Sequence, residues 1–147
     1  MSKILLNKEQ NINFQLKSIE ILEVSINFPE QVIRENKTYH YNMNIQHRIN
    51  LEQKLVIVDT TIETLYQDKK TRLGHIKVAC VYFVESLLDY ISDINDKLVN
   101  LPEAFIISLN SESISTTRGI MFSQFRGTFL HNAVLPIIDQ KGFAVNK

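Results

Sequence analysis

A regular alternation of apolar and polar residues between positions 39 and 49 limits the folds open to this chain more than any other feature. The stretch reads YHYNMNIQHRI, with apolar side chains at every second position except His47. Successive side chains of a strand point to opposite faces of its sheet, so the alternation indicates one buried face and one solvated face. Sheets with one solvated face are antiparallel. The sequence therefore predicts an antiparallel sheet.

Three further segments predict strands of the same sheet. Residues 14–28, 54–66 and 71–84 are rich in β-branched and aliphatic residues, and Pro29 ends the first of them. The polar sequence QDKK between the last two has the length of a hairpin turn. The apolar positions of the first segment change phase partway, which predicts a β-bulge. Four consecutive strands without a helix between them predict a meander.

A long helix should follow the sheet, which makes the predicted class α+β. Asn100 precedes Pro102 and stands three residues before Glu103, a spacing that predicts a capped helix start. The helix should end near Gly127. Its apolar positions are Phe105, Leu109, Ile114, Met121, Phe122 and Phe125. Residues 85–100 fit either an amphipathic helical segment or a crossover loop, and the sequence leaves both open.

The middle of this helix, SLNSESISTTRG, is crowded with small hydroxyl side chains. Gly119 within it costs about 1 kcal/mol relative to alanine, so the helix needs packing partners to be stable. Small side chains also let another backbone approach closely. Two partners for the helix are open: the helix of a second subunit, or the chain's own sheet.

The length of 147 residues fits one domain. Residues 1–13 are polar and expected to be flexible, and residues 14–147 to form the domain. Sixteen basic and sixteen acidic residues balance, so the chain lacks the cationic field with which proteins bind nucleic acid. The single cysteine, Cys80, excludes an internal disulfide. Without a signal-peptide core or the roughly 20 apolar residues that span a bilayer, a soluble, cytoplasmic protein without membrane insertion is expected.

Catalytic and cofactor motifs are missing from the sequence. No nucleophile elbow and no glycine motif for nucleotides occurs, and the four histidines show no ligand spacing. Asp59 and Glu63 share a strand face, where a solvated surface is favoured over an acid–base pair, with His75 as a third candidate for such work. The surroundings of Cys80 predict an inert thiol, and Arg118 is either a surface charge or an anion ligand. We expect no metal, no cofactor and no enzymatic activity.

The chain has more apolar side chains than a small sheet and one helix can bury. This surplus comprises Tyr82, Phe83, Leu87, Leu88, Tyr90, Phe105, Phe122, Phe125 and Phe129. An unburied apolar strip on a soluble protein marks an interface or a site for a peptide. We therefore expect a protein-binding module.

Two stretches of the sequence resemble the SecB family of export chaperones. The opening strand FQLKSIEILEVSINFP, from Phe14 to Pro29, is similar to the family's first strand, which runs from an FQI start to a phenylalanine shortly before a proline. The stretch GTF at residues 127–129, followed by LPII, is similar to the family's GTFP and LAPVNF. The resemblance covers residues 14–143 and is typical of the shorter SecB-like proteins.

The resemblance implies a strongly twisted four-stranded sheet with a long helix, assembled as a homotetramer (a dimer of dimers) through first strands and long helices. The candidate oligomer contacts are then Ile19, Ile21, Ser113, Thr116, Thr117 and Ile120. It also implies ATP-independent binding of unfolded polypeptides or preproteins in apolar grooves between the sheet and the crossover segment. The candidate groove residues are Tyr82, Phe83, Leu87, Leu88, Tyr90, Phe105 and Phe129. Several weak sites used together would hold a client strongly.

The resemblance leaves the partner protein open. The best-known members dock on the translocation ATPase through acidic sheet residues and a C-terminal helix and tail. Of the acidic positions only Glu23 matches, whereas the fourth strand carries Gly74, His75 and Ile76 there. A dedicated client, such as the antitoxin of a toxin–antitoxin system, therefore competes with a role in protein export. A structural or adaptor oligomer without client binding is a further alternative.

Overall fold

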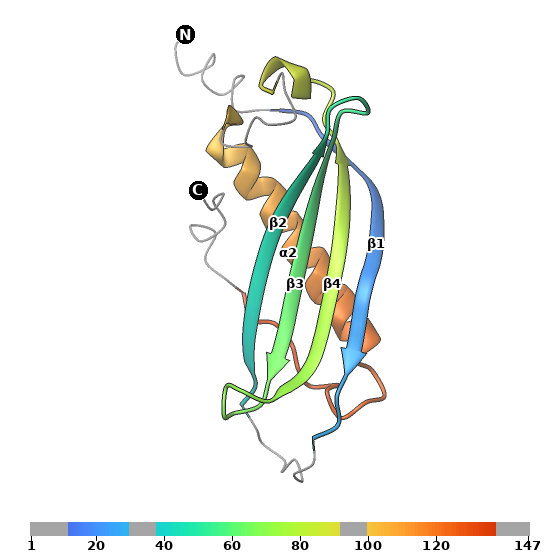
Figure 1. Cartoon of the computed structure of the whole chain (residues 1–147), viewed down its shortest axis with the longest axis vertical. Helices are drawn as coiled ribbons and strands as arrows, with labels where there is room; N and C mark the ends of the chain where they lie inside the picture. The colour runs from blue at the N-terminus through green and yellow to red at the C-terminus, as the bar shows by residue number, and fades with distance from the viewer. Residues whose placement is uncertain (1–11, 30–37, 92–99, 138–147) are drawn as a thin grey trace.

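The computed structural model describes residues 12–29, 38–91 and 100–137. The elements within them (Figure 1) are β1 (Gln15–Ile26), β2 (His40–Asn50), β3 (Leu55–Leu65), β4 (Arg72–Phe83), the 3-10 turn η1 (Leu87–Asp89) and α2 (Glu103–Gln124). The predicted strands, the long helix and the α+β class are confirmed. The expected flexible segment falls almost entirely outside the described residues, and so do residues 138–147 of the expected domain.

The strands form one antiparallel sheet in the order β1-β4-β3-β2, so the predicted meander holds only for β2, β3 and β4. β1 pairs with β4 and not with β2, its neighbour in the sequence. Alternation of apolar residues determines the face on which a side chain lies, but it does not determine which strand lies alongside. β3 and β4 are buried almost throughout and lie in the centre, whereas the more exposed β1 and β2 form the edges.

β1 has two irregularities in its register with β4, one between Leu16 and Ser18 and one between Ile21 and Glu23. They confirm the bulge that the change of phase predicted, because an extra residue in one strand reverses the faces of the residues that follow it. The register places Leu16, Ile19, Ile21 and Val24 opposite Tyr82, Cys80, Val78 and Ile76, respectively. The apolar side chains of β1 thus lie on the same face of the sheet as the core residues of β4.

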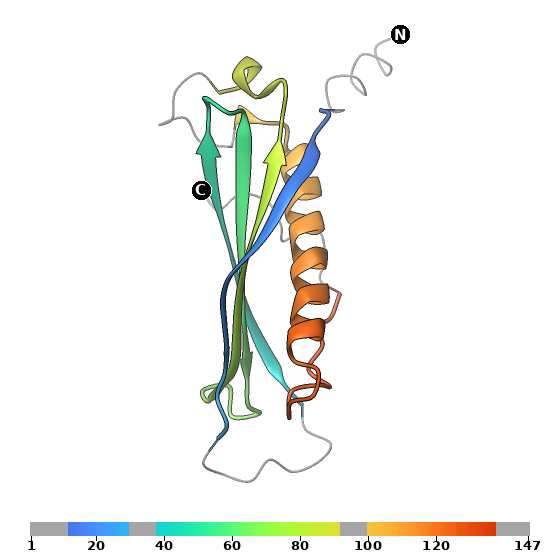
Figure 2. The ribbon, with the colours of Figure 1, turned by 90° about the vertical axis from the view of Figure 1, so that its right-hand side faces the viewer.

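α2 lies along one face of the sheet and packs against β3 and β4 (Figure 2). The core between helix and sheet includes Val58, Ile62, Ile76, Val78, Phe105, Leu109, Ile114 and Met121. Of the predicted apolar positions of the helix only Phe122 is exposed. The sequence left two packing partners open for the helix, a second subunit or the chain's own sheet. The structure shows that the helix packs on its own sheet.

The small hydroxyl residues of α2 serve this packing. The Ser113 hydroxyl donates to the Leu109 carbonyl at 2.8 Å and lies 2.8 Å from the Tyr82 hydroxyl, while the Thr117 hydroxyl donates to the Ser113 carbonyl at 2.7 Å. Ser113 and Thr117 are fully buried inside the single chain. The prediction that these two residues contact a second subunit is therefore wrong, because their small volume lets the helix approach its own sheet.

The start of α2 differs from the predicted capping arrangement. Its N-cap is Pro102, without a side-chain cap, and the Pro102 carbonyl accepts hydrogen bonds from the amides of Phe105 and Ile106. Asn100 lies too early to cap, because Pro102 itself has the extended conformation (ψ 135°) from which the helix begins. Gly127, with φ of 78°, follows the end of the helix as predicted.

The crossover between sheet and helix is described only in part. It begins with η1, where Leu87 is buried. Residues 92–99 lie outside the described residues. The choice between helix and loop is therefore settled only for the first residues, which form a short 3-10 turn.

Candidate functional site

Three of the predicted groove residues belong to the core. Tyr82, Leu87 and Phe105 are at most 3% exposed. The rings of Tyr82 and Phe105 each meet the ring of Phe14 edge-on, with centroids 5.7 Å and 5.4 Å apart. The prediction that these three residues line an open groove is wrong, because a helix that lies on its own sheet buries part of the aromatic surplus within the chain.

The other four predicted groove residues do not form one site. Leu88 is exposed, and Phe83, Tyr90 and Phe129 are partly buried. Phe83 ends β4 on the face opposite to Tyr82. Phe129 contacts the exposed ring of Phe28 edge-on at 5.1 Å, near the start of β4. Phe83 and Phe129 therefore lie towards opposite ends of the sheet.

The largest group of exposed apolar side chains on one element lies on β1. We call Leu16, Ile19, Ile21 and Val24 the β1 surface; each of them is between 39% and 45% exposed. They lie on the helix side of the sheet, but α2 packs against β3 and β4 and leaves them uncovered. Ile19 and Ile21 were predicted as contacts between subunits. Leu16 and Val24 were not predicted as such contacts. The change of phase of the apolar positions in this strand could have shown that they lie on the same face as Ile19 and Ile21.

Of the predicted contact residues on the helix, Thr116 and Ile120 are partly buried. Ile120 packs against the core cluster. Their remaining exposure leaves both available to a second subunit in addition to the β1 surface.

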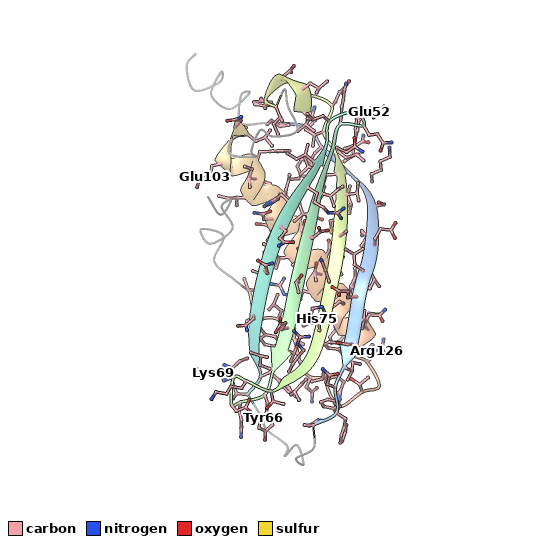
Figure 3. The ribbon with its side chains drawn as sticks, viewed as in Figure 1. Glu52, Tyr66, Lys69, His75, Glu103 and Arg126 are labelled. Carbon is pink, nitrogen blue, oxygen red and sulfur yellow. The ribbon has the colours of Figure 1, made fainter. Side chains whose placement is uncertain are left out.

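The opposite face of the sheet carries ion pairs. Arg48 binds Asp59 through two hydrogen bonds, of 2.7 Å and 2.9 Å, and Arg72 lies 3.2 Å from Glu63. Because both carboxylates are engaged by guanidinium groups, they form no acid–base pair with each other. A carboxylate oxygen of the exposed residue Glu23, the candidate docking residue, lies 3.5 Å from Nε2 of His75. Figure 3 shows His75 on the sheet, at the end nearer to Lys69.

Beyond α2 the chain returns along the helix as an irregular segment, residues 133–137, which we call the strap. Arg118 of α2 donates from Nε to the Leu135 carbonyl at 2.8 Å and from Nη2 to the Pro136 carbonyl at 3.0 Å. Arg118 is therefore a ligand for main-chain carbonyls and not for an anion.

On β2, burial and then the neighbouring Tyr39 raise the pKa of Tyr41 to about 12, although a hydrogen bond from the Val134 main chain lowers it.

The buried titratable groups are placed for packing. Burial raises the pKa of the Cys80 thiol and of the Tyr82 hydroxyl, so both are kept in their neutral forms. Burial lowers the pKa of His47, whose Nε2 lies 2.7 Å from Asn110 Oδ1. Among the residues that the structure describes, no group of three His, Cys, Asp or Glu side chains could hold a metal ion. No helix in the described ranges is long and apolar enough to cross a membrane.

Comparison with known proteins gives a likeness in structure. No model of a protein family matches the sequence, and no curated protein matches it either. Among solved structures, the chain is similar to the SecB-like chaperone Rv1957 of Mycobacterium tuberculosis, solved in complex with a ChAD peptide from the antitoxin HigA1. The match has a TM-score of 0.60 and 11% sequence identity, and it covers 86% of this chain and 90% of the chaperone. The chain therefore has the SecB-like fold that its first strand and C-terminal stretch resemble in sequence.

Proposed function

We propose that this protein is an ATP-independent chaperone that binds unfolded or non-native polypeptides and works as a homotetramer in the cytoplasm. The β1 surface carries the proposal, because a single chain leaves this row of apolar side chains uncovered on an edge strand. The likeness in fold to a chaperone solved with a peptide supports it. The balanced charge of the sequence favours polypeptides over nucleic acid as partners.

Self-association and client binding are both driven by the burial of exposed apolar area. Burial of apolar area is favourable by roughly 25 cal/mol per Å², so a second copy that covers Ile19 and Ile21 stabilises the pair. Each subunit of the assembly then offers weak sites to the same client. Linked weak sites raise the overall affinity by roughly 100-fold to 10,000-fold without any new kind of contact.

The range of clients has two candidate answers. The similar chaperone of Mycobacterium tuberculosis was solved with an antitoxin peptide, which favours a dedicated client of that kind here. The exposed carboxylate of Glu23 instead offers a contact for the translocation ATPase and a role in export, although His75 competes for that carboxylate. A broad chaperone slows the aggregation of unrelated clients, whereas a dedicated one protects its own client alone.

A structural or adaptor oligomer is the second candidate function. The burial of Tyr82, Leu87 and Phe105 favours it, because these side chains are then unavailable to clients. In that case the β1 surface would be used up in self-assembly. The oligomer would form, but no unfolded polypeptide would bind to it.

The test combines light scattering with an aggregation assay. The purified chain should have a mass near four protomers, and a molar excess should slow the aggregation of reduced insulin and of thermally denatured luciferase without ATP. An oligomer that slows neither client contradicts a broad chaperone and favours a dedicated client or the adaptor function. A monomer that leaves both aggregation rates unchanged would falsify the proposed chaperone.

A further inference from the structure

The side chains of the strap alternate between buried and exposed, as those of a bound extended peptide do. Ala133 and Leu135 are at most 2% exposed, whereas Val134 between them is 46% exposed and Pro136 is also exposed. Alternate side chains of an extended segment point to opposite sides, so the strap inserts one small and one larger apolar side chain and leaves the others in solvent. It belongs to neither a helix nor a strand. Ala133 and Leu135 belong to the hydrophobic core cluster, so the strap is held by two inserted side chains and not by pairing with a strand.

The polar contacts of the strap are made to its main chain. Arg118 donates to the carbonyls of two consecutive residues, Leu135 and Pro136, from the side of α2. Tyr41 contacts the Val134 main chain from the side of β2. Peptide groups are the same in every polypeptide, so these two side chains can bind an extended segment of any suitable apolar sequence.

We propose that an extended apolar segment of a client polypeptide replaces the strap and binds Arg118 and Tyr41 in its place. Arg118 would then hold two consecutive client carbonyls, while a small and a larger client side chain take the positions of Ala133 and Leu135. The strap acts as an internal competitor that covers the site until a client arrives. This inference deepens the proposed chaperone function and rests on it.

The strap can detach from the helix while the chain just before it stays bound to the core. Leu130, before the strap, is fully buried and packs so close to Gly74 that a Cβ there would lie 2.8 Å from the Leu130 Cδ1. Farther along, Val134 and Ile137 are exposed, and Pro136 has no amide to donate. The chain therefore stays attached at Leu130 while the strap exchanges with a client.

The test uses full-length variants and fluorescein-labelled, reduced and carboxymethylated α-lactalbumin, with binding followed by fluorescence anisotropy. Leu135→Asp weakens the strap and leaves Arg118 and Tyr41 in place. If the strap covers the site for about 90% of the time, the Kd for the client should fall about tenfold. Val134→Asp is the matched control: it adds the same charge at an exposed position next to Leu135, and its Kd should stay within about twofold of the wild-type value.

The role of Arg118 is tested in the Leu135→Asp background, where the strap no longer competes. Adding Arg118→Ala should abolish the tenfold gain, because client carbonyls then lose their donor. An unchanged Kd in Leu135→Asp, or a gain that survives Arg118→Ala, contradicts the inference.

A measurement on the wild-type protein covers the case in which Leu135→Asp does not fold. Hydrogen exchange at the amides of Val134 and Leu135 should become faster when the labelled lactalbumin is added, and an unchanged rate contradicts exchange of the strap. A wild type that does not bind the lactalbumin contradicts a broad chaperone function and this inference together. A wild type that binds the client while Leu135→Asp binds it equally well contradicts the strap alone.

Discussion

The contact between α2 and the sheet is mainly apolar, but it also buries several hydroxyl groups. Tyr82 and Ser113 satisfy each other at 2.8 Å. The hydroxyls of Thr60 and Thr64 on β3 are buried and have no hydrogen-bond partner in the part of the chain that the structure describes. A buried hydroxyl without a partner costs roughly 1–3 kcal/mol. The contact between helix and sheet is therefore weaker than its apolar area suggests.

Replacing Thr60 by valine should stabilise the protein. Thr60→Val removes an unpaired hydroxyl and keeps the branched shape, so the free energy of unfolding should rise by about 1 kcal/mol in a urea titration. Ser113→Ala is the opposite case, because it leaves the buried Tyr82 hydroxyl without its short hydrogen bond, and it should lower the same quantity by about 1 kcal/mol. A lower stability of Thr60→Val would show that its hydroxyl has a partner.

His47 should make the stability depend on pH below neutrality. Burial lowers its pKa in the folded chain below the ordinary value of 6.5, so the unfolded chain takes up a proton more readily. The contribution of His47 is complete above about pH 6.5 and is lost as the pH falls towards the lowered pKa. Urea titrations between pH 7.5 and 5 should show this decline. His47→Gln keeps a donor for Asn110 without titrating, so its stability should decline less steeply over the same range.

At the scale of the elements, α2 is stable because of what lies beneath it and not because of its own sequence. One side of the helix is buried on β3 and β4, and its serine-rich opposite side faces solvent. Gly119 lies on the exposed side, with nothing within 4 Å of the position a Cβ would take. Packing thus compensates for low helix propensity.

Two glycines of different environment test this view. Gly119→Ala should raise the free energy of unfolding by about 1 kcal/mol, because alanine favours the helix and meets no neighbour. Gly74→Ala should destabilise the protein, since its Cβ would lie 2.8 Å from Leu130 Cδ1 and 2.9 Å from Phe125 Cζ. Thermal unfolding followed by circular dichroism separates the two. If the variants changed the melting temperature in the same direction, the helix would not pack on the sheet as described.

At the scale of the whole molecule, one side of the sheet is only partly covered. α2 packs against the central strands, whereas the β1 surface lies on an edge strand and stays exposed in the single chain. Exposed apolar edge strands promote association with other chains. The single chain therefore leaves an apolar edge of its sheet in solvent.

The β1 surface should control self-association. The double substitution Ile19→Gln/Ile21→Gln should lower the mass measured by light scattering, because amide groups would replace the apolar side chains that a second copy covers. Ser18→Gln/Glu20→Gln, on the opposite face of the same strand, is the matched control and should keep the wild-type mass. Equal masses for both variants would show that the apolar face of β1 takes no part in the subunit contact.

The sequence by itself determined the elements and the faces of their side chains. The alternation at residues 39–49, the change of phase in β1 and the position of Gly127 are local patterns, and backbone geometry converts such patterns directly into strands, bulges and helix ends. Ile19 and Ile21, which the sequence predicted as contacts between subunits, accordingly lie exposed on β1. Only the tertiary structure decided that β1 pairs with β4, that Tyr82 is buried and that Arg118 holds the strap. These outcomes depend on contacts between residues far apart in the chain, which no local pattern specifies.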